Sequence, residues 1–399
     1  MSANIPAIEG GKPVRETALQ YGHQYIDETD IEAVVKVLKS DFLTCGPEIT
    51  KLEKRLCELT GANYAYAVSN GTAALHIAMQ ALSIGEGDEV ITTPITFAAS
   101  ANCALYCGAR PVFADIDEKT YNINPAAVEK VITERTKAIV AVDFTGQAVD
   151  LKPLRAICDK YHLYLVEDAA HSIGTKYEGK PVGSIADITT FSFHPVKTVT
   201  GGEGGAVLTN DKSLADRIEL FRSHGITRRQ ELMENPSEGP WYYEQVELGE
   251  NYRMTDMQAA LISSQLDKLP AFTKRRKEIV AQYNRAFSEM PEVLVQEEIA
   301  ESDTTRHLYI LRLDFAMLSV DRKQFFEAMA AEGVRCNVHY IPVYRHPYYR
   351  RLGYVQGLCP NAEALYASMM SLPLYYSMSD ADVSDVIEAV KKLVTYYRK

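Results

Sequence analysis

Residues 191–208 read FSFHPVKTVTGGEGGAVL, in which two strand-like segments flank a turn with one lysine and four glycines. The order of these residues excludes two common phosphate-binding loops. In a P-loop the lysine follows the glycines, whereas Lys197 precedes them. A dinucleotide-binding loop opens a helix, whereas GGEGG is followed by the strand-like AVLTN. Partners elsewhere in the chain must therefore decide whether Lys197 is a functional residue or an ordinary surface lysine.

The segments on either side of this stretch alternate between β-rich and helix-like patterns. The β-rich segments between residue 64 and about residue 210 are AYAVS, DEVITT, RPVFADI, KAIVAVDF, LYLVED, ITTFSF and GAVLTN. The helix-like segments between them are TAALHIAMQALSIG, FAASANCALYCG, PAAVEKVI and LKPLRAICDKY. This alternation predicts an α/β fold with a mostly parallel central sheet and helices on both faces.

The length of 399 residues allows one large and one smaller domain. We expect an N-terminal arm (1–27), a large α/β domain (28–265) and a smaller α+β domain (266–399) that a long helix introduces. Residues 226–251, which include Trp241, are polar and interrupted by Pro and Gly. They are predicted to form an excursion near the site or at an interface. The segment VRCNVHY is interpreted as a strand.

The formal net charge of −11 argues against binding to nucleic acid or to an anionic membrane. The N-terminal residues lack a basic flank followed by an apolar segment, and no apolar run approaches the roughly 18 residues that cross a membrane. We therefore expect a cytoplasmic protein with neither kind of partner. Most of the seven cysteines are predicted to be reduced thiols. Cys103 and Cys107 are spaced for a helix face, but no second ligand pair accompanies them, so no metal site is predicted.

Asp168 ends the apolar run LYLV, where a buried carboxylate without a partner is costly. Lys197 follows the next β-rich segment, so the strand ends of one sheet can bring both groups to the same edge. A direct ion pair between them is one interpretation. The other is a pyridoxal phosphate site, in which the carboxylate keeps the pyridine nitrogen protonated and the lysine amine bonds to the aldehyde of the same ring.

That cofactor also requires a phosphate site, which SNGTAALHIA (69–78) can supply. Asn-Gly-Thr opens a helix whose first amides face an anion, and the hydroxyls of Thr72 and Ser192 can join them. The same residues could instead only cap the helix. Phe97 follows a strand end and either covers one face of the cofactor ring or belongs to the core. His171 either hydrogen-bonds the phenolic oxygen of the cofactor or Asp168, or is a structural histidine.

Six motifs follow one another between residues 46 and 260: GPEITKLEKRL, SNGTAALHIA, TPITFAASANC, VEDAAHSIG, SFHPVKTVTGGEGG and GENYRMTDMQAA. On these motifs the chain resembles the DegT/StrS family of pyridoxal-phosphate sugar aminotransferases, which have the fold of aspartate aminotransferase. Two features depart from the family pattern: Gly71 stands where some relatives have another small residue, and the surroundings of Trp241 match no motif.

The resemblance implies a role for each matching residue. Lys197 would carry the cofactor, Asp168 would face its pyridine nitrogen, His171 would lie near its phenolic oxygen and Phe97 would stack on its ring. Contacts to the cofactor and its phosphate would come from Gly71, Thr72, Ala73 and Ser192. The resemblance further implies a homodimer, in which Asn251 reaches the phosphate held by the neighbouring subunit.

Within the family, RSHGITR, RHLYILRL and NVHYIPVYRHPYY resemble the C4 aminotransferases of the pseudaminic acid pathway. The implied reaction transfers the amine of L-glutamate to a UDP-4-keto-6-deoxy-N-acetyl-L-hexosamine. Candidate substrate contacts are Thr44, Arg253, His339, Tyr340 and Arg345. Arg253 could hold a donor carboxylate or a diphosphate. The basic and aromatic residues 339–351 could hold a uracil ring and a diphosphate or could form a solvated loop.

Three alternatives remain open at this point. The chain could aminate another keto-sugar, at C3 or linked to dTDP or GDP. It could be a sugar dehydratase, although that branch of the family has histidine in place of Lys197. It could also be a regulatory protein that binds the cofactor without turnover. For the aminotransferase we expect ping-pong kinetics, with Lys197 as proton-transfer base and its pKa lowered by neighbouring positive charge and partial burial.

Overall fold

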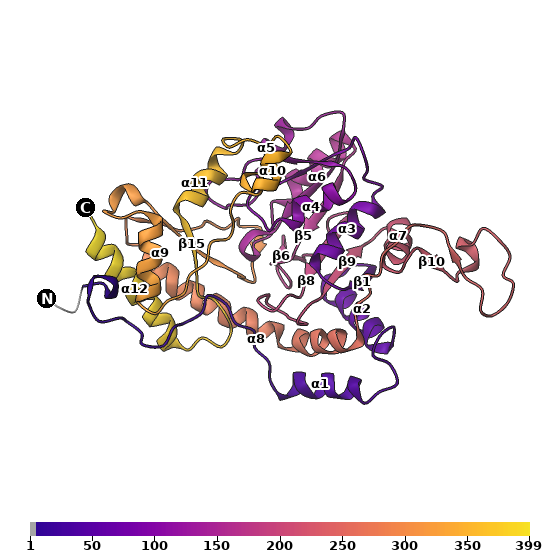
Figure 1. Ribbon diagram of the computed structural model, residues 1–399, viewed down its shortest axis with the longest axis horizontal. Helices are drawn as coiled ribbons and strands as arrows, with labels where there is room; N and C mark the ends of the chain where they lie inside the picture. The colour runs from indigo at the N-terminus through magenta and orange to yellow at the C-terminus, as the bar shows by residue number, and fades with distance from the viewer. Residues whose placement is uncertain (1–4) are drawn as a thin grey trace.

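A seven-stranded sheet forms the centre of the computed structural model, which describes residues 5–399 (Figure 1). From edge to edge the strands are β1 (Tyr64–Val68), β9 (Gly205–Thr209), β8 (Ile188–Ser192), β5 (Tyr164–Asp168), β4 (Thr136–Val142), β2 (Glu89–Thr92) and β3 (Arg110–Phe113). β9 runs antiparallel to both of its neighbours, and the other four pairings are parallel. The predicted α/β class with a mostly parallel sheet is confirmed, and each predicted strand of this sheet is present.

Side-chain alternation along the strands divides the core into two layers. On one face, Val140 and Val166 pack in a cluster with α3 (Gly71–Ala81), α4 (Ala99–Tyr106) and α7 (Lys212–Arg222). On the other face, Ile139 and Leu165 pack with α2 (Pro47–Thr60), α5 (Pro125–Lys130), α6 (Leu151–Tyr161) and the first half of α8 (Asp256–Phe287). Helices therefore cover both faces, as the sequence predicts, and the strand ends between the two layers are free to carry polar groups.

A second core lies at the C-terminal end of the chain. It is built on the antiparallel strands β12 (Val293–Leu294), β14 (Tyr309–Leu313) and β15 (Met369–Leu372), with α9 (Arg322–Ala331) and α12 (Asp380–Tyr397). Leu19 belongs to this core, and its amide donates to the carbonyl of Gly333 at 2.8 Å. The N-terminal arm thus lies along the C-terminal part of the molecule. Residues 1–4 of the arm fall outside the described residues, and the domain limits at 27 and 265 stay predictions.

The long helix α8 connects the two cores without interruption (Figure 1). It begins at a capping box in which Thr255 and Gln258 satisfy each other's backbone amides. Its 32 residues contain Pro270 near the midpoint. Ile262 and Leu266 pack under the large sheet, whereas Ile279 and Tyr283 belong to the C-terminal core.

The remaining elements are short or peripheral. They are α1 (Glu28–Leu38), β6 (Lys176–Tyr177), β7 (Lys180–Pro181), β10 (Ile226–Thr227), β11 (Glu244–Gln245), β13 (Ser302–Asp303), α10 (Pro347–Arg351) and α11 (Pro360–Ser368). Between residues 5 and 399 no helix combines the length and the apolar character that a membrane crossing requires.

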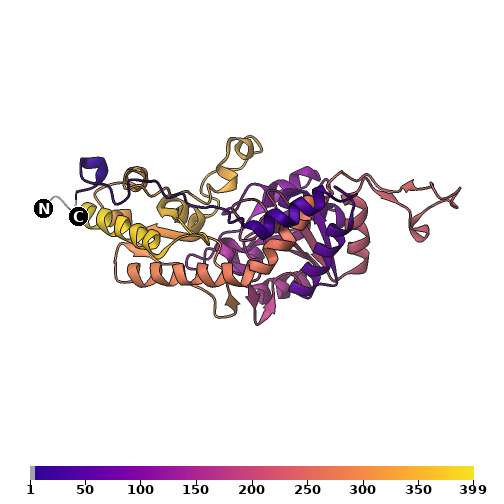
Figure 2. The ribbon, with the colours of Figure 1, turned by 90° about the horizontal axis from the view of Figure 1, so that it is seen from below.

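Residues 226–251 form a ribbon that projects from the body of the molecule, far from the chain termini (Figure 2). β10 and β11 pair at its base, and the side chain of Trp241, in the loop that joins them, is 69% exposed. The prediction of an excursion is therefore confirmed, while its role at an interface remains a prediction.

The expected strand at VRCNVHY is wrong. Val334 makes one bridge to Leu19, and Asn337 makes one bridge to Ser371. Because the two bridges lead to different neighbours, no continuous ladder forms, and the segment runs as irregular chain into the central cavity.

Candidate active site

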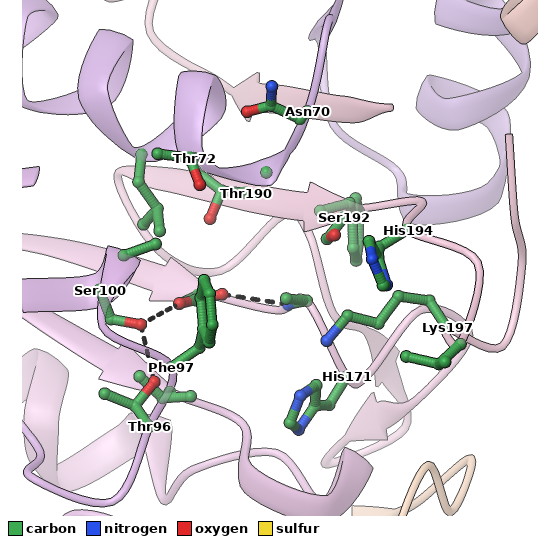
Figure 3. Close-up of a pocket in the computed structure, with 18 of the residues that line it drawn as sticks. Asn70, Thr72, Thr96, Phe97, Ser100, His171, Thr190, Ser192, His194 and Lys197 are labelled. Carbon is green, nitrogen blue, oxygen red and sulfur yellow. Dashed lines mark hydrogen bonds between the residues drawn. The ribbon is translucent and has the colours of Figure 1, made fainter. Parts of the chain in front are cut away.

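A cavity of about 790 Å³ lies at the carboxyl ends of β5 and β8, between the large sheet and the C-terminal part (Figure 3). This is the edge at which open α/β sheets bind ligands. The cavity walls contain ten of the fourteen predicted site residues: Gly71, Thr72, Ala73, Phe97, Asp168, His171, Ser192, Lys197, His339 and Tyr340. Tyr21 of the N-terminal arm, which the sequence did not single out, also lines it.

Asp168 is held at the end of β5 by hydrogen bonds rather than by a cation. Its Oδ2 accepts from the hydroxyl of Ser100 at 2.6 Å, and its Oδ1 accepts from the amide of Ala170 at 3.2 Å. Ser100 also hydrogen-bonds Thr96 at 2.7 Å (Figure 3). Burial raises the pKa of Asp168, and these hydrogen bonds and the nearby amine of Lys197 oppose that rise. Asp168 and Lys197 do not form the direct ion pair that the sequence left open.

Ser100 and Thr96 are site residues that the sequence analysis missed. Both lie in the quoted motif TPITFAASANC, but their pairing depends on where α4 begins. They are four residues apart, which places two hydroxyls on one face only if the chain turns helically there. The pairing of the two hydroxyls can be predicted only when the first residue of α4 is known.

Lys197 lies in the turn after β8, where its amide donates to the carbonyl of His194 at 2.9 Å. Its side chain extends into the cavity from the side opposite Ser100 (Figure 3). Burial lowers the pKa of Lys197 to about 8, and the negative charge of Asp168 opposes this. No positive charge in residues 5–399 contributes to this shift, because the adjacent His171 and His339 are held neutral.

Three buried histidines cluster on the side of the cavity that faces the C-terminal part: His171 and His339 line the cavity, and His307 packs against His171. The His171 and His307 rings lie 4.4 Å apart between centroids, and His339 donates to or accepts from Ser371 at 2.8 Å. Burial lowers the pKa of His171 and His307 well below the usual range and that of His339 to about 4. All three are therefore neutral near pH 7.

His171 keeps one ring nitrogen free for a ligand. Its Nε2 lies 3.3 Å from the hydroxyl of Tyr340, whereas its buried Nδ1 has no hydrogen-bond partner in the described chain. It makes no hydrogen bond to Asp168, so of the alternatives the sequence left open, only a ligand contact or a structural role remains.

The first turn of α3 offers amide groups beside a serine. Asn70 caps the helix by accepting from the amide of Ala73 at 2.8 Å, so the Ala73 amide is already engaged. The amides of Gly71 and Thr72 have no acceptor within the helix and remain available to an anion. Both interpretations of SNGT therefore hold at once: Asn70 is the cap, and the two residues after it can hold a ligand.

Position 71 requires glycine because any side chain there would clash with Ser192 at the end of β8. A Cβ on Gly71 would lie 2.9 Å from the Cβ of Ser192, so an alanine would push the helix start away from β8. We expect Gly71→Ala to weaken pyridoxal phosphate binding about tenfold, the equivalent of about 1.4 kcal/mol, through overpacking. Fluorescence titration with the cofactor measures this. Gly85→Ala is the matched control, because a Cβ there meets no atom within 4 Å.

Phe97 is placed for a contact with a flat ligand. Its side chain is 63% exposed although it lines the cavity, and its ring centroid lies 6.4 Å from that of Tyr340. An aromatic side chain left this exposed at a cavity wall has a free face on which a ring can stack. The interpretation of Phe97 as a core residue is therefore wrong.

Four predicted residues lie outside this cavity. Arg253 lines a separate depression beside β10 and donates to Ser223 Oγ at 2.9 Å. Thr44 and Asn251 are exposed on the surface. The guanidinium of Arg345 lies 4.9 Å from the ring centroid of Tyr366. Within one chain these four residues do not line the cavity that contains Lys197, and their contacts with a substrate stay predictions.

The model of the DegT/DnrJ/EryC1/StrS aminotransferase family matches residues 24–391. The chain belongs to this family. The activity it carries is that of a sugar aminotransferase dependent on pyridoxal phosphate.

Individual relatives agree with this assignment. The chain is 42% identical over 382 residues to the spore coat polysaccharide biosynthesis protein SpsC of Bacillus subtilis, with 95% of this chain and 98% of SpsC covered. It is 37% identical over 385 residues to a UDP-4-amino-4,6-dideoxy-N-acetyl-beta-L-altrosamine transaminase of Campylobacter jejuni, with 94% and 99% covered. The structure of Helicobacter pylori PseC, an aminotransferase involved in the biosynthesis of pseudoaminic acid, superposes with a TM-score of 0.88 at 33% identity and covers 95% and 100%.

The residues of the cavity fit pyridoxal phosphate. Buried Thr190 Oγ1 and His171 Nδ1 lack partners within the described chain, as expected of groups that face a ligand. Two free helix amides and the close approach of Gly71 to Ser192 form a cradle for a phosphate. Solved relatives include forms with pyridoxal phosphate and with pyridoxamine phosphate.

Proposed function

We propose that this aminotransferase transfers the amine of L-glutamate to C4 of a UDP-linked 4-keto-6-deoxy-N-acetyl-L-hexosamine. The observation that carries the proposal is the position of Lys197 and Asp168 at two neighbouring strand ends of one cavity. The sugar and the C4 position are supported by the printed name of the Campylobacter relative and by the likeness to PseC. A cavity of about 790 Å³ is within the range for a nucleotide-sized ligand.

Three residues of the cavity have proposed tasks in the reaction. Pyridoxal phosphate supplies the electron sink that lets a proton leave the α-carbon of an amino acid. Lys197 would hold the cofactor, and its free amine would take the α-proton and return it; a pKa of about 8 leaves a useful fraction of that amine neutral. Asp168 provides a fixed negative charge. His171 stays neutral and is able to hydrogen-bond the cofactor.

The phosphate and the ring of the cofactor have separate proposed contacts. The amides of Gly71 and Thr72 and the hydroxyl of Ser192 would bind the phosphate. Phe97 would cover one face of the ring. Because Asn70 already engages the Ala73 amide, we do not assign that amide to the phosphate.

A homodimer would complete this site. Lys197 is the one lysine or arginine among the residues that line the described cavity, so a phosphate there lacks a permanent counter-charge within the chain. Exposed Asn251 and half-buried Arg253 lie on the surface instead. Exposed apolar side chains on and after α1, among them Leu38 and Phe42, offer area for a partner. We propose that Asn251 and Arg253 of the partner subunit reach the cavity.

The absorbance spectrum of the protein with pyridoxal phosphate tests the proposed donor. We expect L-glutamate alone to convert the visible band of the lysine-bound cofactor into the shorter-wavelength band of its amine form. Addition of the keto-sugar nucleotide should then restore the visible band, because the two half-reactions are separable. A visible band that glutamate leaves unchanged would contradict glutamate as the donor.

The position of the new amine and the nucleotide are tested on the product. Nuclear magnetic resonance of the isolated sugar distinguishes C4 from C3 amination, and competition with UDP, dTDP and GDP sugars ranks the nucleotide. The 42% identity to SpsC makes another keto-sugar of polysaccharide synthesis the second candidate. Preference for a different sugar would leave the aminotransferase assignment in place and overturn the proposed substrate.

A further inference from the structure

Two fully buried carboxyl groups lie behind the strand end that carries Asp168, and the proposed reaction does not use them. Asp143 follows β4, and Glu167 belongs to β5, where Ala141 of β4 lies opposite it. Asp143 and Glu167 are both 0% exposed. Because side chains alternate along a strand, Glu167 points to the face of the sheet opposite that of Asp168.

The hydrogen bonds of this pair leave one oxygen without a donor. Asp143 Oδ2 accepts from the hydroxyl of Ser172 at 2.5 Å, and Oδ1 accepts from the amide of Val149 at 2.9 Å. Glu167 Oε2 accepts from the hydroxyl of Thr189 at 3.1 Å. Glu167 Oε1 is buried and has no partner among residues 5–399. Asp143 follows Val142, which lies opposite Asp168, so continued alternation places the Asp143 carboxyl on the same face of the sheet as that of Glu167.

No cation compensates these two groups in the part of the chain that the structure describes. The charge that acts on the pair from outside is a third carboxyl group, Asp168. The fully buried Glu332 is different, because one of its oxygens lies 2.9 Å from the ammonium of Lys392. Two adjacent ionised carboxyl groups without a cation repel strongly in a low-dielectric interior. One proton held between Glu167 and Asp143 removes the repulsion and satisfies the free oxygen.

We propose that Asp143 and Glu167 share one proton and act as a positioning pair for the turn between Asp168 and His171. The amide of Asp143 donates to the carbonyl of Asp168 at 3.1 Å, and its carboxyl holds Ser172, the neighbour of His171. The pair therefore fixes both ends of the turn. The sharing of the proton stands on burial and contacts alone, whereas the positioning role rests on the proposed function.

The pH dependence of stability follows from this arrangement. The groups that face the pair are the hydroxyls of Ser172 and Thr189, the amides of Val149 and Gly183, and the carboxyl of Asp168. Burial and repulsion by Glu167 raise the pKa of Asp143 well above its usual range, and burial raises the pKa of Glu167 to about 7. An unfolded glutamate loses its proton near about pH 4.3. Between these values the folded state holds the shared proton and the unfolded chain does not. The unfolding constant therefore rises about tenfold per pH unit.

Infrared spectroscopy of the full-length protein tests the shared proton, with and without pyridoxal phosphate. At pH 6 we expect a carboxylic acid C=O band that Glu167→Gln and Asp143→Asn each remove. Glu332→Gln, the buried control with a cationic partner, should leave the band unchanged. Absence of the band in the wild type, or its survival in both variants, overturns the proposal. If one variant fails to fold, the wild-type band and the other variant still decide.

The positioning role is tested by rescue with the conservative variant. Glu167→Ala removes the bridge, and we expect kcat to fall about tenfold with an unchanged KM for glutamate, the loss of about one hydrogen bond to a charged group. Glu167→Gln, whose amide can donate to Asp143, should recover most of that loss and should also flatten the stability slope between pH 4.5 and about 7. Equal losses in both variants would overturn the positioning role. A wild type without turnover would refute the proposed function, while the infrared band would still decide the shared proton.

Discussion

Replacement of Lys197 by alanine is expected to abolish turnover, with a loss of kcat of about 10⁴-fold. This is the upper end of the range for a positioned proton-transfer group, because the same amine also holds the cofactor. The variant should still bind pyridoxal phosphate through the first turn of α3, and it should release the cofactor on dialysis. Treatment with borohydride should attach the cofactor to the wild type and not to the variant, which mass spectrometry of the intact chain measures.

The pH dependence of cofactor attachment separates the role of this lysine from a general structural effect. Since burial lowers the pKa of Lys197 to about 8, the neutral amine becomes scarce below that pH. The rate of attachment should rise about tenfold per pH unit up to about pH 8 and level off above it. Lys176→Ala, a change of an exposed lysine in β6, serves as the control. Wild-type turnover in Lys197→Ala would refute the assignment of the site.

Replacement of Asp168 by asparagine is expected to lower kcat by about 10²–10³-fold, the usual loss when one electrostatic group of a closed site is removed. Asparagine keeps the size of the side chain and can still accept from Ser100, so the fold around β5 should survive. What is lost is the fixed negative charge opposite Lys197. The absorbance band of the bound cofactor should shift, and its response to L-glutamate should slow by a similar factor.

Two further variants show whether charge or geometry is responsible. Ser100→Ala removes the 2.6 Å hydrogen bond but leaves the charge, so a loss of about tenfold is expected, equivalent to about one hydrogen bond to a charged group. Asp267→Asn changes a surface carboxyl group that pairs with Arg55 and should have no effect on turnover. If Asp168→Asn kept wild-type kcat, the negative charge at this position would have no part in the reaction.

The sequence predicted the strands of the central sheet and the residues that meet at its edge because both depend on local patterns. The apolar run before Asp168 and the glycine-rich turn after Lys197 are short-range features. The pairing of Ser100 with Asp168 is different, since it joins residues 68 positions apart and depends on the position at which α4 starts. The engagement of the Ala73 amide by Asn70 was likewise invisible until the helix start was fixed.

The predictions that failed concern segments whose conformation depends on tertiary neighbours. VRCNVHY has the composition of a strand, but Val334 and Asn337 find different neighbours and form no ladder. Arg253 was expected near a substrate because of its guanidinium; in a single chain it lies in another depression, and its substrate contact stays a prediction. Sequence alone indicates the chemistry of such a side chain but not the surface to which it belongs.

The uninterrupted helix α8 determines how this enzyme can move. A helix bends far less readily than a loop, so α8 joins the two halves of the molecule rigidly. The helix is least rigid at Pro270, which has no backbone N–H to donate a helical hydrogen bond. We therefore expect ligands to enter a gap of nearly constant width instead of being enclosed by a large rotation. In such a molecule, substitution of side chains that line the cavity, such as those of residues 337–340, would change the selectivity among sugars. A change in the length of a hinge would not.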